Sequence, residues 1–388
     1  MPISTRHPDT AEQRGGIGPV RLVCRLCGAL LLLVAAACWC LWIVGILWTD
    51  RTLFTQYLYW GGLPLLTAAV LAALAGLVLR AGGPKSRLHR RIARITRWAV
   101  LLSVLCAGWN LLHAGSLFAR GTTLESGGRS IAVLQWNASL DSGIAPKYFL
   151  GRLEDEPPPD VMVITAFLPG ATRIALARHL GESGDSAQAM GISLYSRLPI
   201  LSSQSWTFDL SAARSGDLSR PSPALTRFAH WVFSKAHAAW RTPSGAELAT
   251  LLVVKLDATA TLGRPITVYA VDLPSNPAMS RWFAAELLAG RIAELQTADT
   301  GRIDPPDLVL GDFNTPQGSA SLGLLAPGMH PVSAAGGLGI RATWPRQRPM
   351  LHIDHAFVAS WLRVCDYRII DPGRSEHRAQ CFQLAPAR

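Results

Sequence analysis

Leu308-Val309-Leu310-Gly311-Asp312-Phe313-Asn314 is the stretch from which the fold of this chain can be worked out. An apolar run followed by Gly-Asp-x-Asn predicts a buried strand that ends at a turn. The turn leaves the carboxylate of Asp312 beside the amide of Asn314. Hydrolysis of a phosphate ester uses such a pair, because a carboxylate can hold a metal ion or a water and an amide can hydrogen-bond a phosphoryl oxygen. A plain turn, in which both residues supply only turn chemistry, is the alternative.

The first third of the 388-residue chain differs from the rest in composition. Residues 26–48, 52–79 and 98–119 contain no Asp, Glu, Lys or Arg. Each is long enough to cross a hydrocarbon layer, which needs about 20 apolar residues. The first is too long for the apolar part of a cleaved signal peptide. We therefore predict a cytoplasmic N-terminal tail and an all-α region of three transmembrane helices within residues 1–120.

The net charge of +11 is unevenly distributed along the chain. Residues 1–120 carry 13 basic and 3 acidic side chains, which leaves 24 and 23 for residues 121–388. Residues 80–97, between the second and third apolar segments, carry seven basic and no acidic side chains. Because short basic loops stay in the cytoplasm, the N-terminus and this loop are predicted to be cytoplasmic. In a bacterium this predicts an inner-membrane protein with a periplasmic or otherwise extracytoplasmic C-terminal domain.

Cysteines are divided between the two parts of the chain. Five lie in or beside the apolar segments, where we interpret them as small apolar residues. Cys365 and Cys381 lie on two predicted late strands of the exported part, and an oxidising compartment allows a disulfide between them.

The remainder of the chain has the pattern of a mixed α and β domain. Residues 121–130, rich in Gly, Ser and Thr, are predicted to be a linker. Residues 278–297 have helical spacing, and two apolar runs flanking 263–265 predict a hairpin. Residues 210–247 have no clear assignment. The pattern predicts an α+β or layered α/β sandwich over residues 131–388. Its predicted strands are 131–136, 161–164, 192–195, 251–256, 266–273, 308–310, 353–359, 363–370 and 379–384.

Polar residues follow these strands in a fixed order. Trp-Asn ends at Asn137, Gly-Asp-Phe-Asn ends at Asn314, Ile-Asp-His ends at His355, and Ser-Glu-His ends at His377. In this order they resemble the endonuclease/exonuclease/phosphatase superfamily, the fold of the DNase I-like nucleases, sphingomyelinases and inositol phosphatases. The resemblance covers about residues 131–388, and the arrangement of three spans before the domain is similar to a membrane-anchored bacterial subgroup.

The resemblance implies a four-layer α/β sandwich, DNase I-like, that hydrolyses phosphate esters with Mg²⁺ or Mn²⁺. Asn137 and Asn314 would bind the phosphate, and Asp312 would position the attacking water or the leaving group. His377 would be the general base or a charge-stabilising partner, oriented by Glu376, since a neighbouring carboxylate can fix the tautomer of a histidine.

Further residues complete the implied site. Asp354 would support the metal or a histidine, whereas His355 is expected to be a packed strand histidine. The sequence departs from the family where Ala166 replaces a metal-binding Glu and where Asp272 replaces a His. Loss of the Glu weakens metal binding unless Asp272 or Asp141 compensates. The implied metal ligands are Asn137, Asp312, Asp272 and Asp354.

Three functions follow from these observations. The first is a membrane-anchored phosphodiesterase or phosphatase acting on a small or lipid-borne phosphate ester. DNA is a poorer substrate for it because the domain is nearly neutral. The second is a degenerate domain that binds a phosphate ligand or a partner without turnover. The third is a membrane-assembly protein whose soluble domain is only a scaffold.

Overall fold

The computed structural model describes residues 19–80, 87–114, 129–138, 151–166, 184–214, 247–335 and 341–387, with four positions between 167 and 183. The chain divides into two compact units. One consists of residues 1–42 and 63–107, and the other of residues 43–62 and 108–388. The short segment 43–62 therefore belongs with the C-terminal domain, although it lies between apolar helices in the sequence.

The first unit is helical and apolar on its outside. It is built from most of α1 (Pro19–Trp48), α3 (Gly62–Arg80) and α4 (Arg87–Ala114). Most of the exposed large apolar side chains in the described part of the chain belong to these helices. A Cβ atom on Gly76 of α3 would lie 2.8 Å from the carbonyl oxygen of Gly28 of α1, so two glycines let these helices approach closely.

One of these helices meets the requirements for a transmembrane span by itself. α1 is long and apolar enough, whereas α2 (Leu53–Trp60) and Pro64–Leu79 qualify only together, as a pair bent by 65°. α4 carries five arginines within residues 87–97 and is not among the candidates found in the described residues. An N-terminal apolar helix that can span a membrane is therefore present, and the second and third spans remain predictions.

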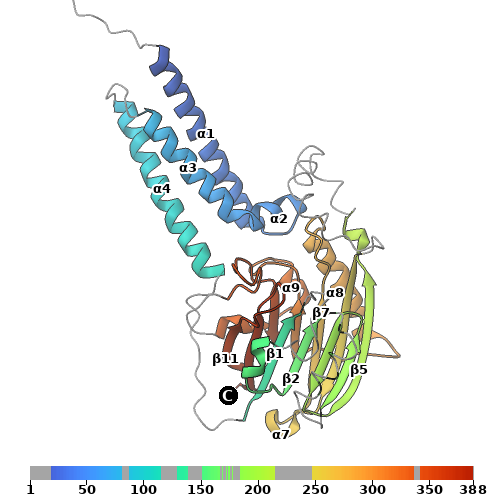
Figure 1. Cartoon of the computed structure of the whole chain (residues 1–388). Coiled ribbons are helices and arrows are strands. Elements are labelled where there is room, and N and C mark those ends of the chain that lie inside the picture. Colours follow the sequence, from blue (N-terminus) through green and yellow to red (C-terminus); the bar gives the residue numbers. More distant parts are fainter. Residues whose placement is uncertain are drawn as a thin grey trace, which may run out of the picture. The chain divides into compact units, whose positions relative to one another are not determined.

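Two six-stranded mixed sheets form the core of the second unit within its described residues (Figure 1). Their strand orders are β11-β12-β1-β2-β4-β3 and β5-β6-β7-β8-β10-β9. In each sheet a single parallel pair, β1–β2 or β7–β8, lies among antiparallel neighbours. The strands are β1 (Ile131–Asn137), β2 (Val161–Thr165), β3 (Asp185–Ala189), β4 (Ile192–Ser196), β5 (Ile200–Asp209), β6 (Leu248–Leu256), β7 (Ile266–Asp272), β8 (Leu308–Asp312), β9 (His330–Pro331), β10 (Asp354–Val358), β11 (Leu362–Ile370) and β12 (Ala379–Pro386).

The two sheets enclose a shared apolar core and carry further clusters on their outer faces. Val133 and Val163 of one sheet pack with Val268 and Leu310 of the other. The helix α8 (Arg281–Thr297) covers the outer face of the second sheet through Leu288 and its neighbours. The outer face of the first sheet carries a cluster that includes the short helix η2 (Gly151–Asp155). This layering is the predicted DNase I-like α/β sandwich. The remaining short helices are η3 (Ser211–Arg214), α7 (Thr259–Leu262), α9 (Leu322–Leu325) and η4 (Val332–Ala335).

Most predicted elements are found, with shifted ends. The predicted hairpin is β6–β7, with α7 inserted in its turn. The predicted helix begins at Arg281, because Ser280 accepts a hydrogen bond from the Phe283 N–H at 3.4 Å and caps it. The strands β3 and β5 were missed, since their sequences are polar and they lie at sheet edges. Most of the unassigned interval 210–247 lies outside the described residues.

The predicted disulfide is not formed. β11 and β12 are neighbours, as expected, but their register pairs Cys381 with Arg368. Cys365 lies at an irregularity between Val364 and Asp366, three positions away along the strand. Both thiols are free, because adjacent strands bring two cysteines within bonding distance only where the register places them opposite each other.

Candidate active site

The inward-facing row of side chains on each central strand changes from apolar to polar at the same end of the sandwich. On β1, Val133 lies in the core, and Asn137 is the last residue of the same inward-facing row. On β8, Leu310 lies in the core, and Asp312 is the last residue of its row. Side chains alternate along a strand, so these polar residues share a face with the core below them. The polar ends of the rows are Gln135, Asn137, Thr165, Asp272, Asp312, Asp354 and Gln380.

Strand register brings these residues together. In the first sheet Asn137 is paired with Thr165. In the second sheet Asp312 lies between Asp272 on β7 and Asp354 on β10. Because in-register neighbours project to the same side, three carboxylates are gathered at one end of the second sheet, facing the amide of Asn137 on the first.

Gly311 allows β8 to lie close to β7 directly before Asp312. Its φ of +144° is one that residues with a side chain rarely adopt, and a Cβ atom there would collide with the backbone carbonyl of Val271. Glycine therefore lets β8 lie close to β7 at the residue before the carboxylate, and this explains the Gly-Asp order of the motif.

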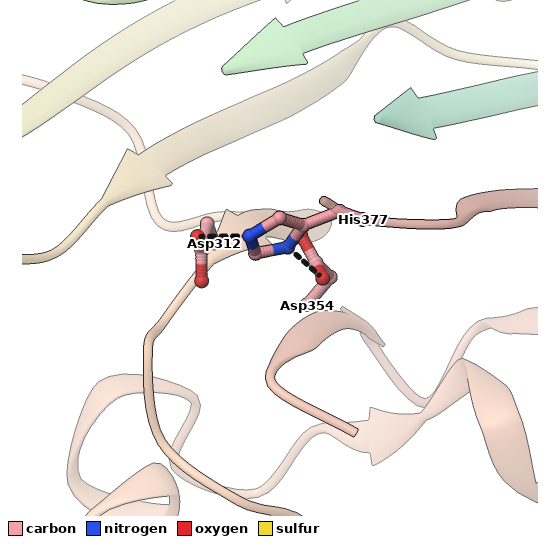
Figure 2. Close-up of side chains that lie close together, drawn as sticks. All are labelled: Asp312, Asp354 and His377. Carbon is pink, nitrogen blue, oxygen red and sulfur yellow. Dashed lines mark hydrogen bonds and ion pairs between the residues drawn. The ribbon is translucent and has the colours of Figure 1, made fainter. Parts of the chain in front are cut away.

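His377 connects two of the carboxylates (Figure 2). Its Nδ1 atom lies 2.9 Å from Oδ2 of Asp354, and its Nε2 atom lies 4.0 Å from Oδ2 of Asp312. Asp312 and Asp354 are fully buried, and only 6% of His377 is exposed. The hydrogen bond to Asp354 fixes the ring, so Nε2 is directed toward Asp312.

Asp354 is held by a chain of amides that crosses to the first sheet. Gln135 donates from Nε2 to Asp354 Oδ1 at 3.4 Å and accepts from Nε2 of Gln380 at 2.7 Å. Tyr367 donates its hydroxyl to Gln380 at 2.9 Å. Thr343 Oγ1 lies 3.3 Å from the backbone N–H of Asp354. These bonds hold the Asp354 carboxylate in place, so that it can orient His377.

Asp312 accepts hydrogen bonds from two asparagines, one at the end of β1 and one just after β8. Its Oδ2 accepts from Nδ2 of Asn137 at 2.6 Å, and its Oδ1 accepts from the backbone N–H of Asn314 at 2.8 Å. Asn314 has a φ of +48°, a conformation that asparagine tolerates, and its side chain donates to the carbonyl of Leu273 at 2.8 Å. Asn137, Asn314 and Asp272 are half-buried and connect the site with solvent.

Burial and charge give the two buried carboxylates opposite pKa shifts. Burial, together with the charge of Asp354, raises the pKa of Asp312 to about 6. Burial acts on Asp354 in the same direction, but the charge and hydrogen bond of His377 lower its pKa below the ordinary value. Burial acts to lower the pKa of His377, but Asp354, Asp312 and Asp272 outweigh it and raise that pKa to about 9. Burial and the charge of Asp312 raise the pKa of Asp272 well above its ordinary value.

Two expected roles need correction. Glu376 was expected to orient His377, but it is exposed, and the carboxylate on the ring is that of Asp354. Ala166 was expected at the metal position, but it packs against the outer cluster of the first sheet. The inward position beside Asn137 is Thr165, because alternation turns the next residue outward.

Two other expectations have different outcomes. His355 is a packed histidine, as predicted: it is buried, and its Nε2 lies 2.7 Å from the carbonyl oxygen of Thr315. Asp141, the alternative metal ligand, lies outside the described residues.

The sequence interpretation missed the inner support of the site. Gln135 and Gln380 are fully buried, and neither was singled out. A signal for Gln135 was present, since it is the one polar residue between Ile131 and Trp136 and shares the inward parity of Asn137. Nothing comparable marked Gln380, because its partner on β1 is known only from the register.

The donor atoms at this end suit a hard divalent cation. Asp312, Asp354 and His377 each offer a ligand atom, and these atoms lie within 4.8 Å of one another. The two carboxylates supply the oxygen donors that Mg²⁺ and Mn²⁺ prefer.

A buried hydroxyl group also favours a bound ligand at this site. The hydroxyl of Thr165 is buried and has no hydrogen-bond partner among the described residues, beside Asn137 and on the inward face. A buried polar atom without a partner costs free energy, which a ligand or an ordered water in the site would offset. The residues present therefore fit a bound cation, although the family's Glu is missing.

A known protein family matches more than half of the chain. The chain matches the Endonuclease/Exonuclease/phosphatase family over residues 109–377. No curated protein matches it. A solved endonuclease/exonuclease/phosphatase from Beutenbergia cavernae DSM 12333 is 15% identical, with 67% of this chain and 72% of that chain covered and a TM-score of 0.41. The inositol polyphosphate 5-phosphatase domain of spsynaptojanin, solved with inositol (1,4)-bisphosphate and calcium, is 14% identical over 66% and 84% of the two chains, with a TM-score of 0.38. Cimex nitrophorin, solved as a ferrous NO complex, is 10% identical over 66% and 97%, with a TM-score of 0.36.

Proposed function

The chain belongs to the endonuclease/exonuclease/phosphatase family, and from this premise we propose that it is a membrane-anchored, metal-dependent phosphoesterase. One observation carries the proposal. His377 lies between the buried carboxylates of Asp354 and Asp312. These three residues lie at the end of the sandwich where the inward-facing side chains of both sheets change from apolar to polar. Groups whose environments push their pKa values apart are typical of a catalytic acid and base, whereas a scaffold has no need of them.

The proposed reaction is attack of water on the phosphorus of a phosphate ester. Asp312, with a pKa of about 6, orients the water and accepts its proton. The bond from phosphorus to the ester oxygen breaks, the leaving oxygen takes up a proton from solvent water, and Asp312 returns its proton to the solvent. His377, protonated at neutral pH because its pKa is about 9, places its charge on the phosphoryl oxygens. Asp354 keeps the ring in position, and Asn137 contacts the phosphate.

A divalent cation, when bound, would neutralise charge on the phosphoryl group and the leaving oxygen. Asn137, Asp272 and Asp312 would hold it, with the Thr165 hydroxyl beside them. Asp272 ends the strand next to Asp312, so it is the carboxylate best placed to replace the family's missing Glu.

The membrane anchor and the location are also part of the proposal. α1 can span a bilayer, and the exposed apolar side chains of α3 and α4 favour lipid as their surroundings. The basic residues at 80–97 support a cytoplasmic loop there, and hence a domain on the extracytoplasmic face of the inner membrane of a bacterium.

The test is hydrolysis by the purified full chain in detergent. Bis-p-nitrophenyl phosphate and p-nitrophenyl phosphate separate diesterase from monoesterase activity, with Mg²⁺ or Mn²⁺ added or chelated. We expect metal-dependent release of p-nitrophenol. Asp312→Asn and His377→Gln should each lower kcat by a factor of about 100 or more, as expected for loss of a catalytic base or a charge-stabilising group.

Glu376→Gln is the matched control, because it removes an exposed carboxylate directly beside His377 in the sequence. It should keep the rate of the parent. Metal-independent turnover, or equal loss in the control and in Asp312→Asn, would contradict the proposed site.

A second candidate is a domain that binds a phosphate ligand without turnover. The absence of a carboxylate at the end of β2, where Thr165 and Ala166 stand, favours it. It predicts that titration calorimetry detects Mg²⁺-dependent binding of inorganic phosphate by a chain that hydrolyses neither ester.

A further inference from the structure

The segment between the first two apolar helices is bound to the C-terminal domain. We call residues 49–60, which include α2, the docking segment. Gln56 is fully buried, and its Nε2 donates to the carbonyls of Pro277 and Met279, each at 3.1 Å. Its Oε1 accepts from the backbone N–H of Arg281 at 2.9 Å. One side-chain amide thus makes three hydrogen bonds to the domain.

A second set of contacts lies on a different loop. Asp50 is fully buried and accepts hydrogen bonds from the hydroxyl of Ser321 and, at 3.2 Å, from its backbone N–H. Tyr59 donates its hydroxyl to the carbonyl of Gln317 at 2.7 Å. A Cβ atom on Gly318 would collide with that hydroxyl, so the fit is close. A carboxylate is buried only where partners satisfy it, so the bonds from Asp50 to Ser321 indicate a specific contact between the segment and the domain.

Both contacted loops leave the active site. Residues 273–280 directly follow Asp272, and residues 315–321 directly follow Asn314. The two loops are themselves joined, because Asn314 Nδ2 donates to the Leu273 carbonyl. The buried guanidinium of Arg281 donates to the carbonyls of Pro274, at 2.5 Å, and Asn276, at 3.1 Å. The docking segment therefore contacts both loops that follow the proposed catalytic carboxylates of the second sheet.

The docking segment is continuous with the apolar helices at both ends. α1 ends at Trp48, and α3 begins at Gly62. Trp48 directly precedes it, and Tyr57, Tyr59 and Trp60 lie at its C-terminal end; such aromatic residues are enriched where a membrane helix meets water. A segment that directly follows a helix able to span a bilayer and carries aromatic side chains at its end suits a position at the bilayer surface.

We propose that the docking segment holds the mouth of the active site at the bilayer surface, and that the substrate is a phosphate ester in the headgroup of a membrane lipid. This rests on the proposed function and adds its substrate class. A soluble ester offers the same phosphate chemistry, but a site that acts on one gains nothing from attachment to the ends of two spans. Holding the site at the surface raises the local concentration of a lipid-borne ester and orients it.

The test compares two esters that share a leaving group. One is a phosphatidyl p-nitrophenol in phosphatidylcholine vesicles that contain the full chain, and the other is bis-p-nitrophenyl phosphate in water. Water attacks phosphorus and p-nitrophenolate leaves in both. For the parent chain we expect the lipid ester to be the better substrate. Gln56→Ala should lower kcat/KM for the lipid ester about tenfold or more, since loss of positioning costs rate, and should change that for the soluble ester by less than about twofold.

Gln296→Ala is the matched control, because it removes one amide hydrogen bond, to Tyr269, at the opposite end of α8 from Arg281 and the site loops. It should leave both rates unchanged. Amide hydrogen exchange provides a readout that does not depend on turnover. In Gln56→Ala, exchange should become faster in residues 273–280 and 315–321, and in Gln296→Ala it should not.

The outcomes separate the two proposals. Equal loss on both esters in Gln56→Ala would mean that the segment only supports the fold, and would overturn the inference. Turnover of the soluble ester alone by the parent chain would overturn the lipid substrate but leave the phosphoesterase standing. If neither ester is hydrolysed with Mg²⁺ or Mn²⁺, the proposed function fails and the substrate class fails with it.

Discussion

Asp312 and Asp354 show how two buried carboxylates of the same site acquire different properties. Asp354 has the imidazole of His377 on one oxygen and Gln135 on the other, and it stays ionised. Asp312 has two neutral donors and a carboxylate neighbour, and its pKa is raised to about 6. The difference comes from their partners, since both are fully buried. It supports the proposed roles, in which Asp354 orients His377 and Asp312 transfers the proton.

The pH dependence of stability tests this assignment. The pKa of His377 is about 6.5 in the unfolded chain and about 9 in the folded one, so the pair with Asp354 contributes fully below pH 6.5. Between these values the unfolded chain loses its proton first, so stability falls as the pH rises, by at most about 3 kcal/mol. In chelator, the thermal midpoint of the parent should fall from pH 6.5 to 9. His377→Gln should flatten this slope, and an unchanged slope would show that another group titrates.

Thr165 permits a test of the cation site at a single atom. Thr165→Val keeps the shape and removes a buried hydroxyl that has no partner among the described residues. Without metal the variant should be more stable by up to about 1 kcal/mol, since an unsatisfied polar atom is removed. With Mg²⁺, it should lose much of the rise in the thermal midpoint that binding gives the parent. A full Mg²⁺-dependent rise in Thr165→Val would remove the hydroxyl from the proposed site.

Gly311 sets the close approach of β7 and β8. Gly311→Ala should destabilise the domain by at least about 2 kcal/mol, because a positive φ is combined with a collision against the Val271 carbonyl. Gly263→Ala is the control, because it also has a positive φ, of +84°, but open space around its Cβ position. Chemical unfolding of the two variants should show the larger loss at Gly311, and equal losses would mean that the collision is relieved.

At the scale of elements, the sequence predicts strands that carry a regular apolar pattern, but it does not predict features that depend on which strands pair. Apolar runs located the central strands, because a strand buried on both faces needs them. The edge strands β3 and β5 lack such runs and were missed. Motif order located Asp312, Asp354 and His377, but not which carboxylate bonds the histidine. That choice depends on the pairing of β10 with β8, and no local pattern encodes it. The same limit explains the wrong disulfide, since the register of β11 and β12 separates the two cysteines.

At the scale of the whole molecule, the docking segment constrains the topology. If the chain is anchored as proposed, residues 49–60 and the domain lie on one side of the membrane, because they are in contact. An even number of crossings must then separate Gly62 from Arg129, as two spans in α3 and α4 would provide. A reporter active only in the periplasm should therefore be active when fused at residue 388 or inserted at residue 61, and inactive at Lys85. Opposite signals from residues 61 and 388 would be incompatible with the contact.

The contact between Asp50 and Ser321 joins residues 271 positions apart in the chain. Synthesis runs from the N-terminus, so in the proposed topology Asp50 reaches the far side of the membrane long before Ser321 has been made. Until then its carboxylate stays hydrated, because a charge without partners is not buried. In that topology we expect an ordered biogenesis: the helices insert first, the domain is translocated and folds next, and the contact between Asp50 and Ser321 forms last.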